Sequence, residues 1–300
     1  MKTQKTVLIT GASGFIGRHT VKRLAANGWM VYAQHLPAEN PASLDNVSWF
    51  PCDLSDPAAT QSWPAQCDHI IYLAQSPLWR NFPEGAQDVF EVNVAAVIRS
   101  IEYARLAGSQ CFIFASSGSV YSQTSVAARE NEPLDISKNR NFYTASKLAA
   151  ELLIGSYQNL MSVISLRFFM PYGNGQNPNM LIPNLVQRVR EHQAIELHGN
   201  NGMQLNPVTI ADLTETLERC LMLGKSATLN VAGPEILSLR QIGECIGRIT
   251  ENVPEFTCHP EQTEPVIIGD TTALKTHLDW VPQTGLDTGL RAWLRSEKPA

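Results

Sequence analysis

The chain has little excess charge of either sign and no long hydrophobic run. Its 300 residues carry 23 Lys and Arg against 28 Asp and Glu, a formal net charge of −5 at pH 7. This slightly acidic balance gives no electrostatic reason to expect a nucleic acid or an anionic membrane as partner. No apolar run approaches the roughly 20 residues that a membrane-spanning helix needs. We therefore expect a protein without a nucleic-acid or membrane partner.

Paired cysteines and clustered histidines are also missing. The six cysteines are scattered, with no Cys-x-x-Cys spacing, so no metal site is expected. Free thiols in a reducing cytoplasm are the expected state of these residues. The first five residues lead into an apolar strand without a signal-peptide pattern, which also favours a cytoplasmic protein. Internal repeats and low-complexity tracts are absent as well.

Three glycines follow the first apolar run. Val7–Thr10 reads as a strand, Gly11, Gly14 and Gly17 come next, and 18–26 reads as a helix. A strand that turns into a helix in this way directs free N–H groups and the positive end of the helix dipole at one point. A dinucleotide pyrophosphate binds at such a point in a Rossmann unit. The spacing alone also fits an ordinary strand–helix turn.

Short apolar runs alternate with helical segments through the first half of the chain. The expected strands are Val7–Thr10, Met30–Gln34, Val47–Cys52, His69–Ala74, Cys111–Ser116 and Val163–Phe168. The expected helices lie near 15–27, 56–63, 84–108 and 142–159. This alternation predicts an α/β fold, a Rossmann-type doubly wound parallel sheet with helices on both faces.

The pattern changes after about residue 170, where a loop rich in Pro, Gly and Asn begins. Helices are then expected near 180–192, 211–223 and 238–250, and strands near 194–198 and 227–231. We assign 1–170 to a dinucleotide-binding Rossmann domain. Residues 171–300 form mainly a smaller α/β substrate-binding lobe, from which some C-terminal segments are free to return to the core. The substrate is expected between the two.

Tyr143 and Lys147 stand one helical turn apart. An ammonium beside a phenol lowers the pKa of the phenol, so the pair is suited to exchange a proton with a substrate oxygen during hydride transfer. Ser117 stands at the mouth of the buried strand 112–116 and offers a hydroxyl to the same oxygen. Chance helical spacing and ordinary serine turn chemistry are the alternatives to this interpretation.

Taken in order, these motifs resemble the extended short-chain dehydrogenases/reductases, in particular the NAD-dependent epimerase/dehydratase family that includes UDP-galactose 4-epimerase. The resemblance covers nearly the whole chain. Besides the glycine turn, its motifs lie at 52–56, 72–74, 92–94, 116–121, 143–147, 166–173, 208–212 and 278–282.

The resemblance implies a role for each matching residue. Ser117 matches the hydroxyl that polarises the substrate oxygen, Tyr143 the acid/base, and Lys147 the residue that binds the nicotinamide ribose and tunes the tyrosine. With Tyr143 and Lys147, the implied cofactor-binding residues are Gly11, Gly14, Phe15, Ile16, Gly17, His35, Asp53, Leu54, Leu73, Ala74, Gln75, Asn93, Phe168 and Pro171. The implied substrate-binding residues are Ser76, Ser117, Ser119, Met170 and Asn206. A homodimer through helices near 84–108 and 144–159 is implied as well.

The chain departs from the family pattern near the cofactor and beside the catalytic hydroxyl. Gly118 and Ser119 replace the Asp-Glu pair of the dehydratases, which disfavours a 4,6-dehydratase. His35 stands where NAD-preferring members often place an acid. No Arg or Lys between 30 and 45 is available for a 2′-phosphate, although Arg18 is a candidate. We expect NAD, with NADP left open.

The residues that hold a nucleotide diphosphate in such enzymes are also incomplete. Met170, Asn206 and the segment 259–264 replace an Asn and two Arg of the family pattern. Losing two guanidinium groups from a diphosphate site costs several kcal/mol, since charge-assisted contacts contribute roughly 1.5–3 kcal/mol each. A standard UDP-sugar pocket is therefore in doubt, unless Arg188, Arg190 or Arg240 substitutes.

The sequence thus predicts an NAD(P)-dependent epimerase or oxidoreductase that transfers a hydride at a secondary alcohol or ketone of a sugar-like molecule, with or without a linked nucleotide. One alternative is an NAD(P)H-dependent ketoreductase of a non-nucleotide substrate. Another is a non-catalytic protein that senses the cofactor, which typically lacks the tyrosine or the lysine; both are present here.

Overall fold

The computed structural model describes residues 4–121, 126–134 and 141–296. The chain divides into two compact units. Unit 1 comprises residues 1–120, 135–167 and 217–229, and unit 2 comprises 121–134, 168–216 and 230–300. Over the described residues, none of the helices is both long and apolar enough to cross a bilayer.

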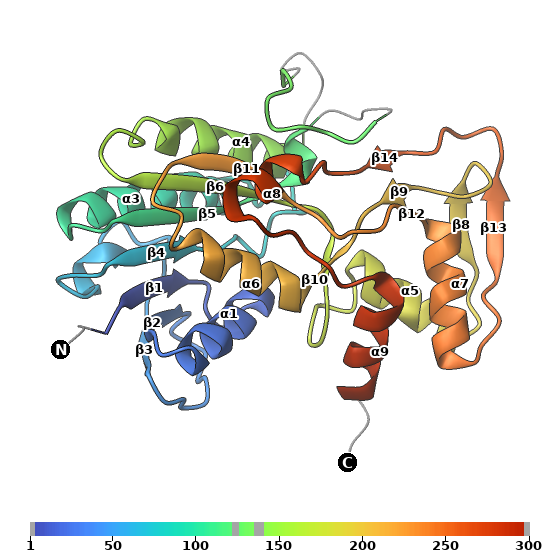
Figure 1. Ribbon diagram of the computed structural model, residues 1–300, viewed down its shortest axis with the longest axis horizontal. Helices are drawn as coiled ribbons and strands as arrows, with labels where there is room; N and C mark the ends of the chain where they lie inside the picture. Colours follow the sequence, from blue (N-terminus) through green and yellow to red (C-terminus); the bar gives the residue numbers. More distant parts are fainter. Residues whose placement is uncertain (1–3, 122–125, 135–140, 297–300) are drawn as a thin grey trace. The chain divides into compact units, whose positions relative to one another are not determined.

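A seven-stranded sheet in the order β11-β6-β5-β4-β1-β2-β3 organises unit 1 (Figure 1). Its strands are β1 (Thr6–Thr10), β2 (Met30–His35), β3 (Val47–Pro51), β4 (His69–Tyr72), β5 (Cys111–Ser117), β6 (Ser162–Phe168) and β11 (Ala227–Val231). Strand β1 pairs in parallel with both β2 and β4, so the direction of winding reverses beside it. In sheets of this kind, ligands bind outside the carboxyl ends of the strands at that reversal.

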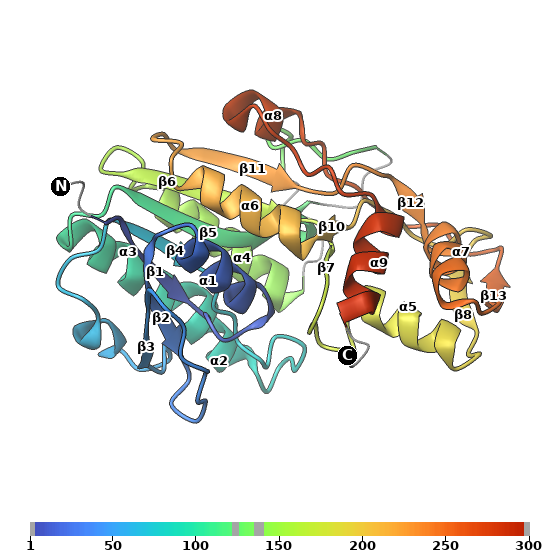
Figure 2. The same ribbon diagram turned by 60° about the horizontal axis from the view of Figure 1, so that its bottom comes forward.

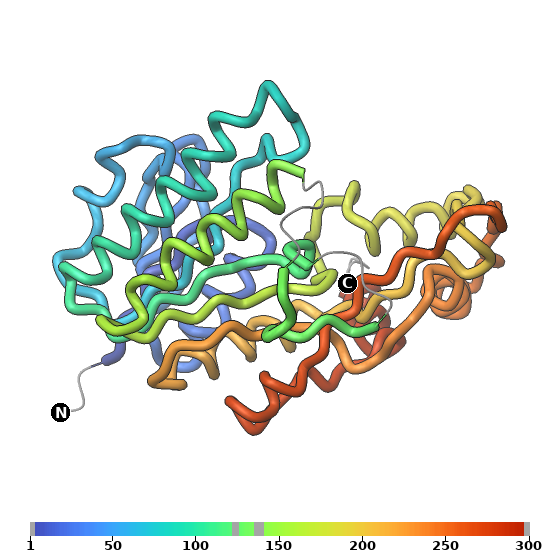
Figure 3. The backbone as a smooth tube through the Cα atoms, turned by 90° about the horizontal axis from the view of Figure 1, so that it is seen from above, coloured from blue at the N-terminus to red at the C-terminus, as the bar shows by residue number. Residues whose placement is uncertain are grey.

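Helices cover both faces of this sheet. They are α1 (Phe15–Ala26), α2 (Ala86–Phe90), the π-helical turn η2 (Glu91–Ala95), α3 (Ala96–Leu106) and α4 (Phe142–Gly155), with 3₁₀ turns η1 (Ala59–Ser62) and η3 (Gly118–Val120). Helices α3 and α4 run side by side (Figure 3). Helix α1 lies across the sheet from them (Figures 1 and 2).

Side-chain alternation along the strands explains this three-layer arrangement. Leu8, Ile70 and Phe112 are direct partners on β1, β4 and β5, and they pack in one core with Val97 and Ile101 of α3. Successive residues of a strand point to opposite faces, so the neighbours of these residues face the other helix layer. All five side chains are fully buried. A sheet buried on both faces requires the continuous apolar strands that the sequence shows.

The sequence-based elements of the first half are found with small shifts in their ends. The segment expected as one helix near 84–108 is α2, η2 and α3 in succession, and the one near 56–63 is the turn η1. Strand β11, expected in the smaller lobe, instead pairs with β6 at the edge of the main sheet. Its apolar run gave no sign of which sheet it would join, because pairing partners are set by tertiary contacts.

Unit 2 is built from short strands and amphipathic helices. Its strands are β7 (Pro171–Tyr172), β8 (Ile195–His198), β9 (Gln204–Leu205), β10 (Val208–Thr209), β12 (Leu237–Ser238), β13 (Phe256–His259) and β14 (Val266–Ile267). Its helices are α5 (Leu181–Arg190), α7 (Leu239–Thr250), α8 (Thr272–Leu278) and α9 (Leu286–Ser296), while α6 (Ile210–Cys220) is shared with unit 1. Helices α5, α7 and α9 enclose a core that includes Val186, Ile246 and Leu290 (Figure 2).

Candidate active site

The glycine turn between β1 and α1 has no room for side chains at two of its positions. Gly11 has a φ of +63°, and a Cβ atom there would lie 2.9 Å from the backbone N and Cα of Ala74. A Cβ atom at Gly17 would lie 2.1 Å from the carbonyl oxygen of Gly11. Gly14 is the N-cap of α1 and has no side chain to cap it. The first N–H groups of α1, at Phe15 and after, are therefore left for a ligand.

Gln34 holds this turn in place from the neighbouring strand, a role that the sequence analysis missed. Its side-chain oxygen accepts the Gly11 N–H at 2.7 Å, and its side-chain nitrogen donates to the Cys52 carbonyl at 2.6 Å. The side chain is only 2% exposed. A buried amide requires hydrogen-bond partners, so a glutamine within an apolar strand was the available signal.

The other residues expected at the cofactor stand at or just beyond strand ends. Asp53 follows β3, is exposed, and accepts hydrogen bonds from the N–H and hydroxyl of Ser55. Leu54 is buried in the core, and Leu73 and Gln75 are half-buried beyond β4. Ile16 lies in the first turn of α1.

Ser117 and Tyr143 lie where β5 ends and α4 begins. Ser117 is the last residue of β5, and its hydroxyl donates to the Ser119 hydroxyl at 2.9 Å. Ser119 also accepts from the Thr144 hydroxyl at 3.1 Å, which links the serine turn to the first turn of α4. Asn141 caps α4 by accepting the Thr144 N–H at 2.8 Å, so the helix begins just before Tyr143.

Lys147 is buried beneath the tyrosine. Its ammonium nitrogen donates to the Ala115 carbonyl at 2.8 Å and lies 5.9 Å from the centre of the Tyr143 ring and 5.0 Å from that of Phe114. Burial lowers the pKa of Lys147 to about 7, against the opposing effect of the Glu151 carboxylate. The amine therefore takes up or releases a proton near neutral pH.

The pKa of the Tyr143 phenol shifts in the opposite direction to the one expected from the sequence. Burial raises its pKa, and a hydrogen bond with the Ser117 side chain partly offsets that rise. The expected lowering by Lys147 is not found, because desolvation of the phenol outweighs the other contributions. In this state Tyr143 is a protonated phenol at neutral pH, able to donate.

Asn93 connects the loop after β4 to the backbone of Tyr143. It is fully buried in η2, accepts the Ser76 N–H at 3.1 Å and donates to the Ser146 hydroxyl at 3.1 Å. Ser146 in turn donates to the Tyr143 carbonyl at 2.7 Å. The Ser76 side chain is 1% exposed, and its hydroxyl donates to Asp88. The structure thus places Ser76 in a supporting network rather than on an open surface.

Trp79 is a second residue that sequence reasoning missed. Its ring packs on the Tyr143 ring with 5.0 Å between centroids, and the Arg80 guanidinium lies 4.3 Å from the Trp79 ring centre. Nearby, Phe82 stacks on Phe142 at 5.6 Å. Two aromatic contacts thus hold the segment after β4 against the start of α4. Aromatic residues in a loop of this kind were the only signal in the sequence.

Four other predicted site residues belong to unit 2. Phe168 is buried, while Met170 and Pro171 are half-buried beyond β6. Asn206 is also buried, and its amide exchanges two hydrogen bonds with the backbone of Gly269 at 2.9 and 3.1 Å. That amide therefore supports the chain around Gly269.

Two of the arginines considered for a diphosphate are engaged within their own unit. Arg188 donates to the Ala194 carbonyl at 2.6 Å. Arg240 donates to the Asn200 carbonyl at 2.9 Å and stacks on Phe256 at 4.6 Å. Neither guanidinium is held ready for an anion in this structure.

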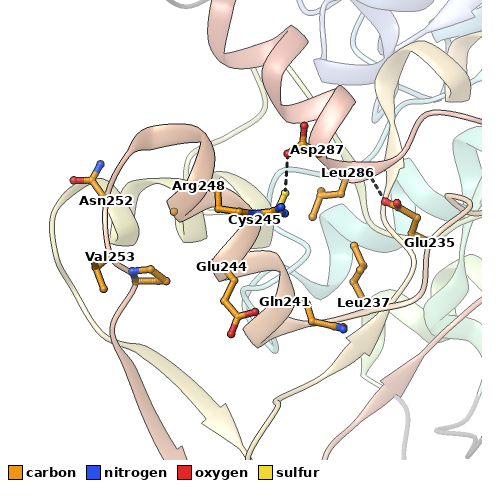
Figure 4. Close-up of a pocket in the computed structure, with 12 residues that line it drawn as sticks. Glu235, Leu237, Gln241, Glu244, Cys245, Arg248, Asn252, Val253, Leu286 and Asp287 are labelled. Carbon is orange, nitrogen blue, oxygen red and sulfur yellow. Dashed lines mark hydrogen bonds between the residues drawn. The ribbon is translucent and has the colours of Figure 1, made fainter.

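A cavity of about 700 Å³ in unit 2 is lined by none of the predicted site residues (Figure 4). Its lining includes Cys245, whose thiol lies 3.9 Å from the Asp287 carboxylate, and Glu235, which accepts the Leu286 N–H. Burial raises the pKa of the Cys245 thiol, so this is not a reactive thiolate.

Comparison with known families identifies the chain. A family model described as the NAD dependent epimerase/dehydratase family matches residues 7–227. The chain belongs to this family. The match includes the glycine turn, Ser117, Tyr143 and Lys147. The resemblance and the fold class expected from the sequence are thereby confirmed, and the family is one of enzymes.

Individual relatives have low identity but extend over most of the chain. The dTDP-4-dehydro-6-deoxy-D-allose reductase of a Streptomyces species is 26% identical over 98% of this chain and 97% of its own. A probable UDP-glucuronate 4-epimerase of Rhizobium meliloti is 29% identical over 71% of this chain and 67% of its own. The solved structure of MoeE5 in complex with UDP-glucuronic acid and NAD is 26% identical, covers 98% of this chain and 100% of its own, and has a TM-score of 0.81.

Proposed function

We propose that the protein is an NAD-dependent enzyme that transfers a hydride at a secondary alcohol or ketone of a sugar-like, nucleotide-linked substrate. The single observation that carries this proposal is the arrangement of Ser117, Tyr143 and Lys147 where β5 ends and α4 begins. The relatives named above act on, or are bound to, nucleotide-linked sugars.

The residues of unit 1 suit the cofactor. The uncapped start of α1 suits a pyrophosphate, and the close backbone packing that Gly17 permits keeps the turn tight beneath it. Lys147 would bind the nicotinamide ribose, and Asp53 with Leu54 would flank the adenine. When bound, the nicotinamide supplies the site that gives or accepts the hydride.

The chain's own residues move the proton. Tyr143, kept protonated by burial, would donate its proton to the substrate oxygen as a ketone becomes an alcohol, and Ser117 would hydrogen-bond the same oxygen. Lys147, with its pKa near 7, would stabilise the phenolate left behind. A protonated tyrosine can give its proton to the oxygen of a ketone, which favours ketone reduction. The reductase relative that covers 98% of this chain favours it as well.

Epimerisation is the second candidate, supported by the epimerase relative. It would use the same three residues in both directions and return the hydride to the other face of the keto intermediate. The two candidates differ in cofactor turnover. An epimerase keeps one cofactor through many cycles, whereas a reductase must release it.

The test combines cofactor analysis with deuterium transfer. One sample of the purified protein is denatured and its released NAD is measured. A folded sample is incubated with deuterated NADH and 4-keto nucleotide sugars, and another with NAD and 4-hydroxy nucleotide sugars. Deuterium in the product together with oxidised cofactor supports reduction. Product inversion without net cofactor consumption supports epimerisation. Activity only with non-nucleotide ketones would show that the substrate is not a nucleotide sugar.

Substitutions connect the result to the site. Tyr143→Phe should lower kcat by about 10²–10⁴-fold, the usual contribution of a positioned acid/base. Tyr121→Phe is the matched control, because that phenol donates to Asn230 in unit 2 and belongs to no step of the reaction. Full turnover by Tyr143→Phe would overturn the assignment.

We also propose a cytoplasmic homodimer. The six cysteines are free, as expected in a reducing compartment. Leu152 of α4 and Leu106 of α3 are 70% and 71% exposed, and the two helices are neighbours in unit 1. Pairing with a second copy would cover these side chains. Light scattering after size exclusion should give a dimer for the wild type and a monomer for Leu152→Glu; a monomeric wild type would refute the dimer.

A further inference from the structure

Glu39 folds back onto the glycine turn from the loop that follows β2. Its carboxylate oxygen Oε2 accepts the Ser13 hydroxyl at 2.6 Å and the Leu36 N–H at 3.1 Å. The Glu39 N–H also donates to the Leu36 carbonyl at 3.0 Å, which closes the loop as a tight turn. Ser13 stands between Gly11 and Gly14, so the carboxylate is fixed at the edge of the cradle for the pyrophosphate.

This position matters because of where a dinucleotide lies in such a fold. With its pyrophosphate at the start of α1, the adenosine ribose reaches the carboxyl end of the neighbouring strand. β1 and β2 are adjacent and parallel, and the register pairs Ile9 with Ala33, so both strands end at the same edge. An acidic group about 20 residues after the glycines accepts hydrogen bonds from the ribose hydroxyls in NAD-binding proteins.

His35, which holds the usual position for that acid, is engaged elsewhere. Its ring is 8% exposed, packs edge-on against Trp49, and has Nδ1 2.9 Å from the Leu36 carbonyl. Glu39 is exposed instead. Both of its side-chain hydrogen bonds end on Oε2, and over the described residues none ends on Oε1.

We propose that Oε1 of Glu39 accepts hydrogen bonds from the ribose hydroxyls of the cofactor and that Glu39 thereby selects NAD over NADP. The proposal rests on the proposed function, because it requires a dinucleotide at the glycine turn. A 2′-phosphate would bring close to two negative charges against this carboxylate. The segment 30–45 contains no Lys or Arg to neutralise them. The Ser13 and Leu36 hydrogen bonds keep the carboxylate from turning away.

Calorimetric titration of the full chain with NAD and with NADP tests this, in the wild type, Glu39→Gln and Asp45→Asn. Asp45→Asn is the matched control, because it removes the same charge from an exposed residue of the same loop. We expect the wild type to bind NAD at least about tenfold more tightly than NADP, since a charge-assisted hydrogen bond is worth that factor. Glu39→Gln should reduce the preference by about tenfold, and Asp45→Asn should keep it.

The outcomes separate the two proposals. Equal affinity of the wild type for both dinucleotides, or an unchanged preference in Glu39→Gln, overturns the role of Glu39 and leaves the enzyme assignment standing. Binding of neither dinucleotide by a folded wild type that carries no retained cofactor overturns the proposed function, and the role of Glu39 with it. Tighter binding of NADP that is lost in Arg18→Gln would assign the selection to Arg18 instead. A preference that falls as salt is raised supports the electrostatic origin.

Discussion

Glu151 and Arg167 form a buried two-point ion pair one helical turn beyond Lys147. The guanidinium donates to the two carboxylate oxygens at 2.7 and 3.1 Å, and the side chains are 6% and 7% exposed. Glu151 also opposes the lowering of the Lys147 pKa. Arg167 of β6 therefore holds the Glu151 carboxylate, and that carboxylate acts electrostatically on Lys147.

Removing one partner of this pair should be costly. Glu151→Gln leaves the Arg167 charge buried with a weaker partner, and we expect about 3–5 kcal/mol lower free energy of unfolding. Urea denaturation measures this change in the free energy of unfolding. The double variant Glu151→Leu with Arg167→Met removes both charges and should recover much of that loss. A double variant no more stable than the single one would show that packing, not the unpaired charge, sets the cost.

Lys147 should make the stability of the protein depend on pH. Its folded pKa of about 7 lies below its ordinary value of 10.5, so between these limits the unfolded chain binds more protons than the folded one. Stability therefore rises with pH across this window, by at most about 1.4 kcal/mol per pH unit from this group. Urea unfolding from pH 6 to 9 should show wild type gaining on Lys147→Met above about pH 7. Parallel curves for the two proteins would place the pKa of Lys147 elsewhere.

Gly17 should not tolerate even a methyl group. Gly17→Ala places a Cβ atom 2.1 Å from the Gly11 carbonyl, so the turn must open and NAD binding should fall by at least about tenfold. Gly155→Ala, at the end of α4, meets no atom within 4 Å and serves as the control. Fluorescence titration with NADH measures both. Unchanged affinity in Gly17→Ala would contradict the structure of the turn.

Asn93 should contribute to stability as well as to the position of Tyr143. Asn93→Ala leaves the buried Ser76 N–H without its partner and removes the hydrogen bond that the Ser146 hydroxyl accepts, and we expect about 2–6 kcal/mol of destabilisation, at about 1–3 kcal/mol for each buried group. Asn27→Ala, an exposed residue bonded to Glu218, should change stability by about 0.5 kcal/mol or less. Equal thermal shifts in the two variants would remove Asn93 from the supporting network.

The sequence by itself determined the alternating α/β order and the glycine turn, and it pointed to Ser117, Tyr143 and Lys147 as candidate site residues. These follow from local rules: side-chain periodicity sets the elements, and a turn without Cβ atoms requires glycine. The direction in which the Tyr143 pKa shifts could not be predicted in this way, because desolvation depends on every neighbour that surrounds the phenol.

Only the tertiary structure decided which residues support the site. Gln34, Asn93 and Trp79 act across different elements, and the return of Glu39 to Ser13 joins segments 26 residues apart. Strand β11 likewise reaches the main sheet from late in the chain. The hydrophobic pattern encodes which face of an element is buried, whereas the identity of a contact partner is fixed only when distant segments pack together.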